Sequence, residues 1–215
     1  MKRFILFFSF LFFALAAQAQ FSVGLNGTYH SFFGDDSTFS TGDISIFPEM
    51  YGGELRGMYG LGYKTAIKVG LMYRTNGENK YTYQTPATAT DIGLDAKAYY
   101  YLLGAFNATN AGLYGFAGFS GHYFTLSWNR DHVDSVVPLS DQVYFNDLDV
   151  LRIHGNVGLG GEVALGPVYL FGEGQVAFLM NHYVNGTTIF SIPQRDFWSA
   201  SIGVRLPFGA MSPPW

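Results

Sequence analysis

The sequence predicts an all-β protein, an eight-stranded antiparallel up-and-down β-barrel that crosses a membrane. The first observation is residues 151–165, where apolar side chains at odd positions alternate with polar or small ones, so that a strand here has two different faces. Strands of soluble sheets are usually about 5 to 6 residues long, whereas a strand that crosses hydrocarbon needs about 9 to 11. The second observation is that the same pattern recurs in seven other segments. Long, two-faced strands repeated in this way are typical of transmembrane barrels.

Residues 1–19 precede the first strand and predict a cleaved signal peptide. Lys2 and Arg3 come before an apolar run at 4–16, and Ala17 and Ala19 are the small residues expected before a cleavage site. The apolar run is too short to cross about 30 Å of hydrocarbon as a helix. We therefore expect a barrel over residues 20–208 and a short tail over 209–215.

The strands are predicted from the alternation of side chains. Their ranges are 21–33, 47–59, 64–75, 92–106, 113–128, 151–165, 168–180 and 197–208. On the apolar faces, in chain order, stand Val23 and Leu25, Tyr51 and Leu55, Val69 and Leu71, Leu94 and Tyr100, then Val157 and Leu159, Leu170 and Val176, and Ile202 and Val204. The fifth segment is aromatic on both faces, so its outward side stays unassigned.

Two features favour a membrane barrel over a soluble, lipocalin-like barrel with an apolar interior. Aromatic residues near strand ends are typical of membrane interfaces, and five lie on the apolar faces: Tyr29, Tyr59, Tyr73, Tyr100 and Trp198. After residue 19 no run of 18 apolar residues could form a spanning helix, and a chain without one crosses a membrane only as a closed barrel.

The connections alternate in length. Short turns are expected at 60–63, 107–112 and 166–167, and long polar segments at 34–45, 76–91, 129–147 and 181–196. Bacterial outer-membrane barrels have short periplasmic turns and longer external loops. The four long segments are therefore expected outside the cell and both termini in the periplasm.

Composition excludes several classes of function. The sequence has no cysteine, so disulfides and thiolate metal sites are excluded. A formal net charge of −4 is too small to indicate a nucleic-acid partner. We expect no cofactor.

The last strand adds a motif. Ser201, Gly203, Leu206 and Phe208 stand in an order that resembles the C-terminal signal read by the outer-membrane barrel assembly machinery. With the eight strands, the glycine and tyrosine spacing and the segment 168–174, the whole mature chain resembles the small outer-membrane β-barrel families of Bacteroidota. The resemblance implies a monomer surrounded by outer-membrane lipid and assembled by that machinery, and it assigns no activity.

The face opposite the apolar one carries the candidate site. Its ten charged residues are Glu54, Arg56, Lys68, Arg74, Asp95, Lys97, Arg152, Glu162, Glu173 and Arg205. Eight strands enclose an interior just wide enough for side chains to fill, and lone buried charges are costly. We expect a paired, ionic plug, and the alternative is a gated ion path.

Other motifs are weaker candidates. His30 beside Ser31 and the loop residues Asp131, His132 and Asp134 have the residue types of a catalytic or metal site, but spacing shows no convergence, and we expect neither. Asn26, Asn107 and Asn185 match the N-glycan acceptor pattern, and Asp36 and Asp134 resemble starts of an O-glycan acceptor.

The main prediction is a barrel without chemistry that supports the outer membrane or binds through its loops. The alternatives are an enzyme acting on lipid A, a barrel subunit of a secretion or motility complex, and a soluble lipocalin-like barrel that binds an apolar ligand.

Overall fold

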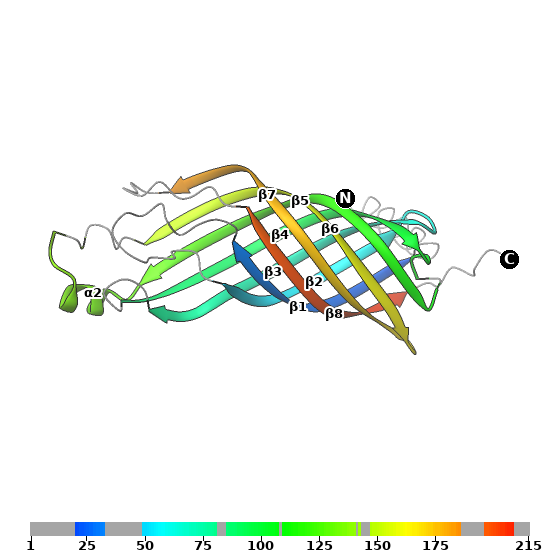
Figure 1. Cartoon of the computed structure of the whole chain (residues 1–215), viewed down its shortest axis with the longest axis horizontal. Helices are drawn as coiled ribbons and strands as arrows, with labels where there is room; N and C mark the ends of the chain where they lie inside the picture. The colour runs from blue at the N-terminus through cyan, green and yellow to red at the C-terminus, as the bar shows by residue number, and fades with distance from the viewer. Residues whose placement is uncertain are drawn as a thin grey trace, which may run out of the picture.

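The computed structural model describes residues 20–32, 49–80, 85–107, 109–140, 142, 147–185 and 196–208. In this part of the chain, eight antiparallel strands form a closed barrel in chain order, and β8 pairs with β1 (Figure 1). The strands are β1 (Phe21–Phe32), β2 (Met50–Gly60), β3 (Thr65–Lys80), β4 (Pro86–Leu103), β5 (Ala111–Trp128), β6 (Leu148–Leu165), β7 (Val168–Asn185) and β8 (Phe197–Phe208). The predicted up-and-down barrel is confirmed.

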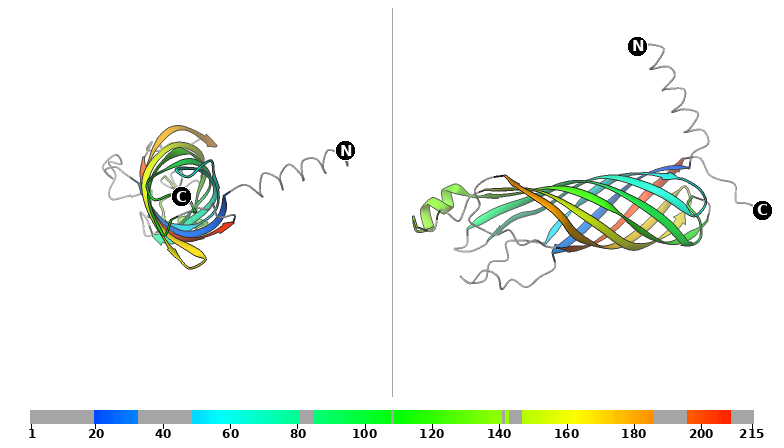
Figure 2. Two further views of the ribbon diagram at one scale, coloured as in Figure 1. Left: turned by 90° about the vertical axis from the view of Figure 1, so that its right-hand side faces the viewer. Right: turned by 90° about the horizontal axis from the view of Figure 1, so that it is seen from above.

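The stagger of the strands sets the width of the barrel. Following paired residues from Phe21 on β1 through every strand leads back to Ser31, ten residues further along β1. Such a stagger makes the strands tilt against the barrel axis, as Figure 2 shows. An eight-stranded barrel has an interior that side chains fill, so what lies inside determines whether it is open.

The two ends of the barrel differ. At the turn end lie the connections 61–64, 104–110 and 166–167, together with Gln20, whose carbonyl accepts from Gly60 N, and Phe208, which pairs with Phe21. At the loop end β3 to β7, with 16 to 18 residues each, rise above β1, β2 and β8, which have 11 or 12. The wall at the loop end is therefore high on the β3–β7 side and low at β8–β1–β2 (Figure 1).

A short helix, α2 (Arg130–Val136), follows β5 at the loop end. The side chain of Asn129 caps it by accepting from His132 N at 3.2 Å, and Val133 and Val137 pack with Trp128. Among the described residues no helix is long and apolar enough to cross a membrane.

Several predicted boundaries are wrong at the loop end. The predicted loop 76–91 is mostly strand, because β3 continues to Lys80 and β4 begins at Pro86. In this extension Ala87 and Ala89 face inward while Thr88 and Thr90 are more exposed. The pattern is thus reversed relative to the apolar-outward strands, which is why a search for apolar outer faces missed it. Likewise β6 begins at Leu148 rather than 151, and β7 ends at Asn185 rather than 180. At the turn end, β4 ends at Leu103 rather than 106.

The outer face of the barrel carries an apolar belt with an aromatic border. Toward the loop end this border consists of Tyr29, Tyr51, Tyr73, Tyr123, Tyr183 and Trp198. Tyr29 contacts both Tyr51 and Trp198, with ring centroids 5.2 and 5.1 Å apart. Two positions beyond the border the outer face becomes polar, as at Thr75, Thr125 and Asp149. Such a border is typical of a membrane interface.

The outward side of β5, left open by the sequence, is now defined. Phe119 and Tyr123 lie on the outer face, while Tyr114, Phe116 and Phe124 are buried inside. The predicted lipid-facing position Leu159 is 63% exposed, and the predicted lumen position Asn156 is 2% exposed. An apolar exterior around a charged interior contradicts the lipocalin-like alternative.

Candidate functional site: the charged lumen

All ten charged side chains assigned to the inner face from sequence lie inside the barrel. Nine of the residues are buried, and the side chain of the tenth, Glu173, is only 5% exposed. They stand on β2, β3, β4, β6, β7 and β8 at positions of one parity within each strand, and a strand places alternate residues on the same face. The lumen can be described as three groups of contacts from the loop end to the turn end.

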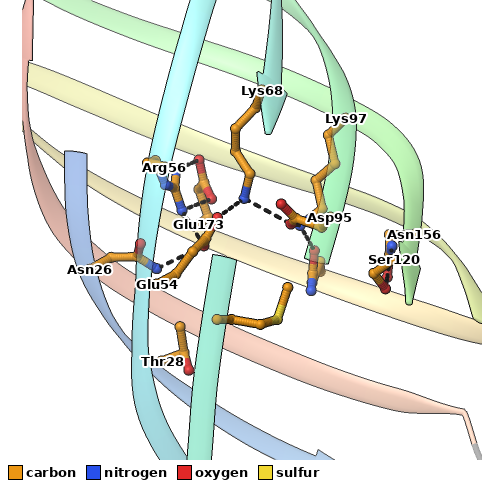
Figure 3. Close-up of polar contacts among 12 residues, drawn as sticks. Asn26, Thr28, Glu54, Arg56, Lys68, Asp95, Lys97, Ser120, Asn156 and Glu173 are labelled. Carbon is orange, nitrogen blue, oxygen red and sulfur yellow. Dashed lines mark hydrogen bonds and ion pairs between the residues drawn. The ribbon is translucent and has the colours of Figure 1, made fainter. Parts of the chain in front are cut away.

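The middle group, here called the charged layer, contains three cations and three carboxylates: Arg56, Lys68, Lys97, Glu54, Asp95 and Glu173 (Figure 3). Its charges balance. Lys68 and Lys97 stand directly opposite each other on β3 and β4, where like charges repel, and the carboxylates between them offset that repulsion.

Each carboxylate of the charged layer is shared by several donors. Glu54 accepts from Arg56 at 3.0 Å and from Asn26 at 3.2 Å, and it also pairs with Lys68. Asp95 Oδ2 lies 2.8 Å from Lys68 Nζ and 2.7 Å from Lys97 Nζ. These contacts join β2, β3 and β4 across the interior.

Glu173 links the charged layer to β7. It accepts from Arg56 through both oxygens, at 2.7 and 2.9 Å, and from the hydroxyls of Tyr99 and Tyr114 at 3.2 and 3.1 Å. A two-pronged arginine–carboxylate contact has directionality as well as strength. It fixes β7 against β2 across the lumen.

Toward the turn end, Arg205 and Glu162 form a separate pair. The two contacts between them measure 2.9 and 2.6 Å, Tyr101 donates to Glu162 at 3.1 Å, and Arg205 also donates to Asn107. The guanidinium of Arg205 lies 4.1 Å from the ring centroid of Tyr169. This pair is enclosed by aromatic side chains.

Toward the loop end, Asp91 collects the cationic side chains. It accepts from Arg74 at 3.1 Å, and Arg152 lies 3.8 Å away. His122 Nδ1 lies 3.1 Å from Asp91 Oδ2. The sequence pattern places Asp91 in a loop, so sequence reasoning misses the carboxylate that organises this group.

Asp91, His122 and Ser120 also have the order of a catalytic triad. His122 Nε2 lies 2.9 Å from Ser120 Oγ, so the imidazole bridges a carboxylate and a hydroxyl. The three residues are 0, 1 and 5% exposed, and Asn156 Nδ2 donates to the same hydroxyl at 3.0 Å. Such an enclosed hydroxyl leaves no room for a substrate, and we interpret the three residues as part of the packed lumen.

Apolar clusters close the lumen on both sides of the polar groups. The turn-end cluster consists of Met58, Ala66, Tyr99, Tyr101, Phe106, Tyr114 and Phe116. The loop-end cluster consists of Met50, Ala87, Ala89, Phe124, Leu126 and Val150. Beside the charged layer, a cavity lined by Glu54, Asp95 and Lys97 among others holds about 20 Å³, which is room for about one water.

The weaker candidates do not converge on a reactive centre. His30 is buried, with Nδ1 3.0 Å from Arg74 and its ring against Phe197, and His132 lies on α2. Within the described ranges, no three residues of metal-ligating type are placed to share an ion. Asp131, His132 and Asp134, weighed from the sequence as a weak candidate for a metal site, are therefore not placed together as one.

The modification motifs have different positions. Asn26 and Asn107 are buried and so are out of reach of a glycosylation enzyme in the folded barrel. Asp134 is exposed on α2, Asn185 ends β7, and Asp36 lies outside the described residues.

Of the predicted assembly residues on β8, Leu206 and Phe208 face outward, while Ser201 and Gly203 lie on the inner side of the strand.

The comparisons with known proteins identify the fold. The structure is similar to that of Neisserial surface protein A (TM-score 0.58, 16% identity), covering 88% of this chain and 99% of that one. A major outer membrane protein from Thermus thermophilus has a TM-score of 0.57 and 13% identity, and the match covers 88% of this chain and 99% of that one. For OprG from Pseudomonas aeruginosa the TM-score is 0.54 and the identity 14%, and the match covers 90% of this chain and 97% of that one. No family model and no curated protein matches the sequence.

The chain therefore has the fold of small outer-membrane β-barrel proteins. The similarity extends over almost the full length of each of these three structures, so the whole barrel and not a part of it is shared. At 13 to 16% identity it is a likeness of fold, and fold alone does not assign a role.

Proposed function

We propose that this protein is a closed, integral outer-membrane barrel that performs no chemistry and presents its loop end, including α2, to the cell exterior. Its role is mechanical support of the membrane or binding through that end. The observation that carries the proposal is the charged layer, in which balanced and shared charges fill the lumen between the turn-end and loop-end apolar clusters. Ions crossing such a lumen would have to break several buried contacts, each of which is costly to lose.

The proposal includes an orientation in the membrane and a route of assembly. With the loop end outside, Gln20 and Phe208 lie in the periplasm, where an exported chain released from a signal peptide at 1–19 would leave its ends. Ser201, Gly203, Leu206 and Phe208 stand on β8, the strand that closes the barrel against β1. Recognition of β8 by the barrel assembly machinery, a monomeric state and a place among the Bacteroidota-type barrels remain part of this proposal.

Two measurements test it. In planar bilayers the purified barrel is expected to show no steady ion conductance, because the lumen is filled. A stable, open conductance in the wild-type protein would replace the plug with the gated ion path.

For orientation, Ser135→Cys on α2 is expected to react with a membrane-impermeant maleimide on intact cells. Asn110→Cys in a turn-end connection serves as the matched control and is expected to react only after the outer membrane is opened. The opposite pattern would reverse the orientation.

A further inference from the structure

The outer wall of the barrel carries an apolar groove near the turn end that the filled lumen does not explain. It crosses β5, β6, β7 and β8 and is an open groove of about 480 Å³. Its floor includes Gly161 and Gly172, which pair directly with each other. In the same row of paired residues, Leu113 borders the floor on β5 and Ile202 borders it on β8.

The barrel itself does not require glycine at this floor. A Cβ added at Gly172 would have Ser201 O at 3.9 Å as its nearest neighbour, and one at Gly161 would have Gly112 O at 3.4 Å. Both are ordinary contact distances, and neither residue has the positive φ found at Gly166. Glycine weakens a strand and can mark a place where another molecule approaches the backbone closely, and here two paired glycines form the floor of a groove.

The groove lies in the outer apolar belt, so a molecule that fills it in a membrane would place a hydrocarbon group there. At its turn end the groove is bordered by Leu103, the last residue of β4. With about 480 Å³, the groove lies in the size range of small-ligand sites, about 300 to 1,000 Å³, which is room for one lipid acyl chain. In a bilayer the gain comes from close packing rather than from the hydrophobic effect, because lipid is itself apolar.

A cation stands beside the end of this groove. Lys64 donates to the carbonyl of Gly104 at 2.7 Å, and Gly104 follows Leu103 in the chain. Lys64 is the one charged residue in the sequence of the turn-end connections 61–64, 104–110 and 166–167. An ammonium group has three donors, so Lys64 can hold the carbonyl and an anionic headgroup together.

We propose that the groove is a binding site for one anionic glycerophospholipid of the leaflet at the turn end, with an acyl chain over Gly161 and Gly172 and the phosphate at Lys64. The site is separate from the lumen, and it depends on the barrel lying in a bilayer but not on what the loop end binds.

The test is a lipid titration followed by native mass spectrometry, with dipalmitoyl phosphatidylglycerol as the probe. Gly172→Leu fills the groove and is expected to weaken binding of the first lipid about tenfold, the change that about 1.4 kcal/mol produces. Gly121→Leu is the matched control, since Gly121 also lies on the outer side of a strand, with nothing within 4 Å of an added Cβ. It is expected to bind as the wild type does.

Further variants keep the outcome decisive. Leu113→Trp fills the groove from its β5 border without changing a glycine, and it replaces Gly172→Leu if that variant does not fold. Lys64→Gln is expected to weaken phosphatidylglycerol binding but not that of dipalmitoylglycerol, which has the same chains and no phosphate.

Equal loss in Gly121→Leu and Gly172→Leu, or wild-type binding in Gly172→Leu, would overturn the proposal. So would a wild-type dimer without bound lipid that dissociates in Gly172→Leu, because the occupant would then be a second copy.

Discussion

At the scale of single residues, the interior depends on every charge having a partner from another strand. The pair of Arg205 on β8 and Glu162 on β6 is the simplest case, because it lies apart from the charged layer and its members contact each other at 2.9 and 2.6 Å. Removing one member leaves the other charge buried among aromatic rings, which costs more than the net contribution of the pair itself.

We therefore expect Arg205→Met to lower the free energy of unfolding by about 3–5 kcal/mol, the usual effect of stranding one half of a buried pair. The double variant Arg205→Met with Glu162→Gln is expected to recover part of that loss, since no charge is then left alone. Reversible urea unfolding in lipid vesicles measures both. A double variant less stable than Arg205→Met would show that Glu162 is not stranded by the loss of Arg205.

The outer face gives a second residue-scale prediction. Leu159 lies on the outer face near the middle of β6, so Leu159→Arg is expected to cost about 2–4 kcal/mol, as a cation does at the midplane of a barrel's lipid face. Thr90→Arg, on the polar outer face above the aromatic border, is the control and is expected to cost less than about 1 kcal/mol. Equal costs in the same vesicle assay would mean that Leu159 does not face lipid.

Residue identity predicted the lumen well, because charge and parity together specify the inner face. Arg56, Lys68 and Arg205 needed no further information. Asp91 was missed since it falls one residue before the predicted fourth strand, and a residue assigned to a loop has no face. Partners such as Ser120 and His122 depend on pairing between β4 and β5, and a single sequence does not state that register.

At the scale of elements, the strands need some of their glycines and not others. A Cβ at Gly52 of β2 would lie 1.9 Å from the carbonyl oxygen of Tyr73 on β3, so glycine lets these two strands approach. A Cβ at Gly174 of β7 would have nothing within 4 Å.

The two glycines make a matched pair of variants. Gly52→Ala is expected to destabilise the barrel by about 1–3 kcal/mol through overpacking, whereas Gly174→Ala is expected to change stability by less than about 0.5 kcal/mol. Thermal unfolding followed by the shift in gel mobility of unheated and heated samples measures both. A larger loss for Gly174→Ala would refute the distinction.

Element boundaries were predicted well at the turn end and poorly at the loop end. The apolar-outward alternation ends where the membrane belt ends, yet β3 to β7 continue beyond it. In the β4 extension, small residues lie inside and threonines outside. Helix α2 has seven residues, too few to be stable alone. Its packing of Val133 and Val137 with Trp128 is a tertiary contact that periodicity does not reveal.

At the scale of the whole molecule, one arrangement accounts for the observations. An apolar belt bordered by aromatic rings surrounds a lumen filled with paired charges, and the wall rises above the belt on one side at the loop end. Such a barrel forms a rigid base that supports the loop end. In this arrangement the odd positions of β6 from Leu151 to Leu165 face the membrane, and the even positions face the filled lumen.

The most direct test is a nitroxide scan along β6 from 151 to 165 in lipid vesicles, read as collision with oxygen dissolved in the bilayer. We expect collision rates to alternate with a period of two, high at Val157 and Leu159 and low at Asn156 and Gly160. High rates at the even positions, or no alternation, would contradict the account.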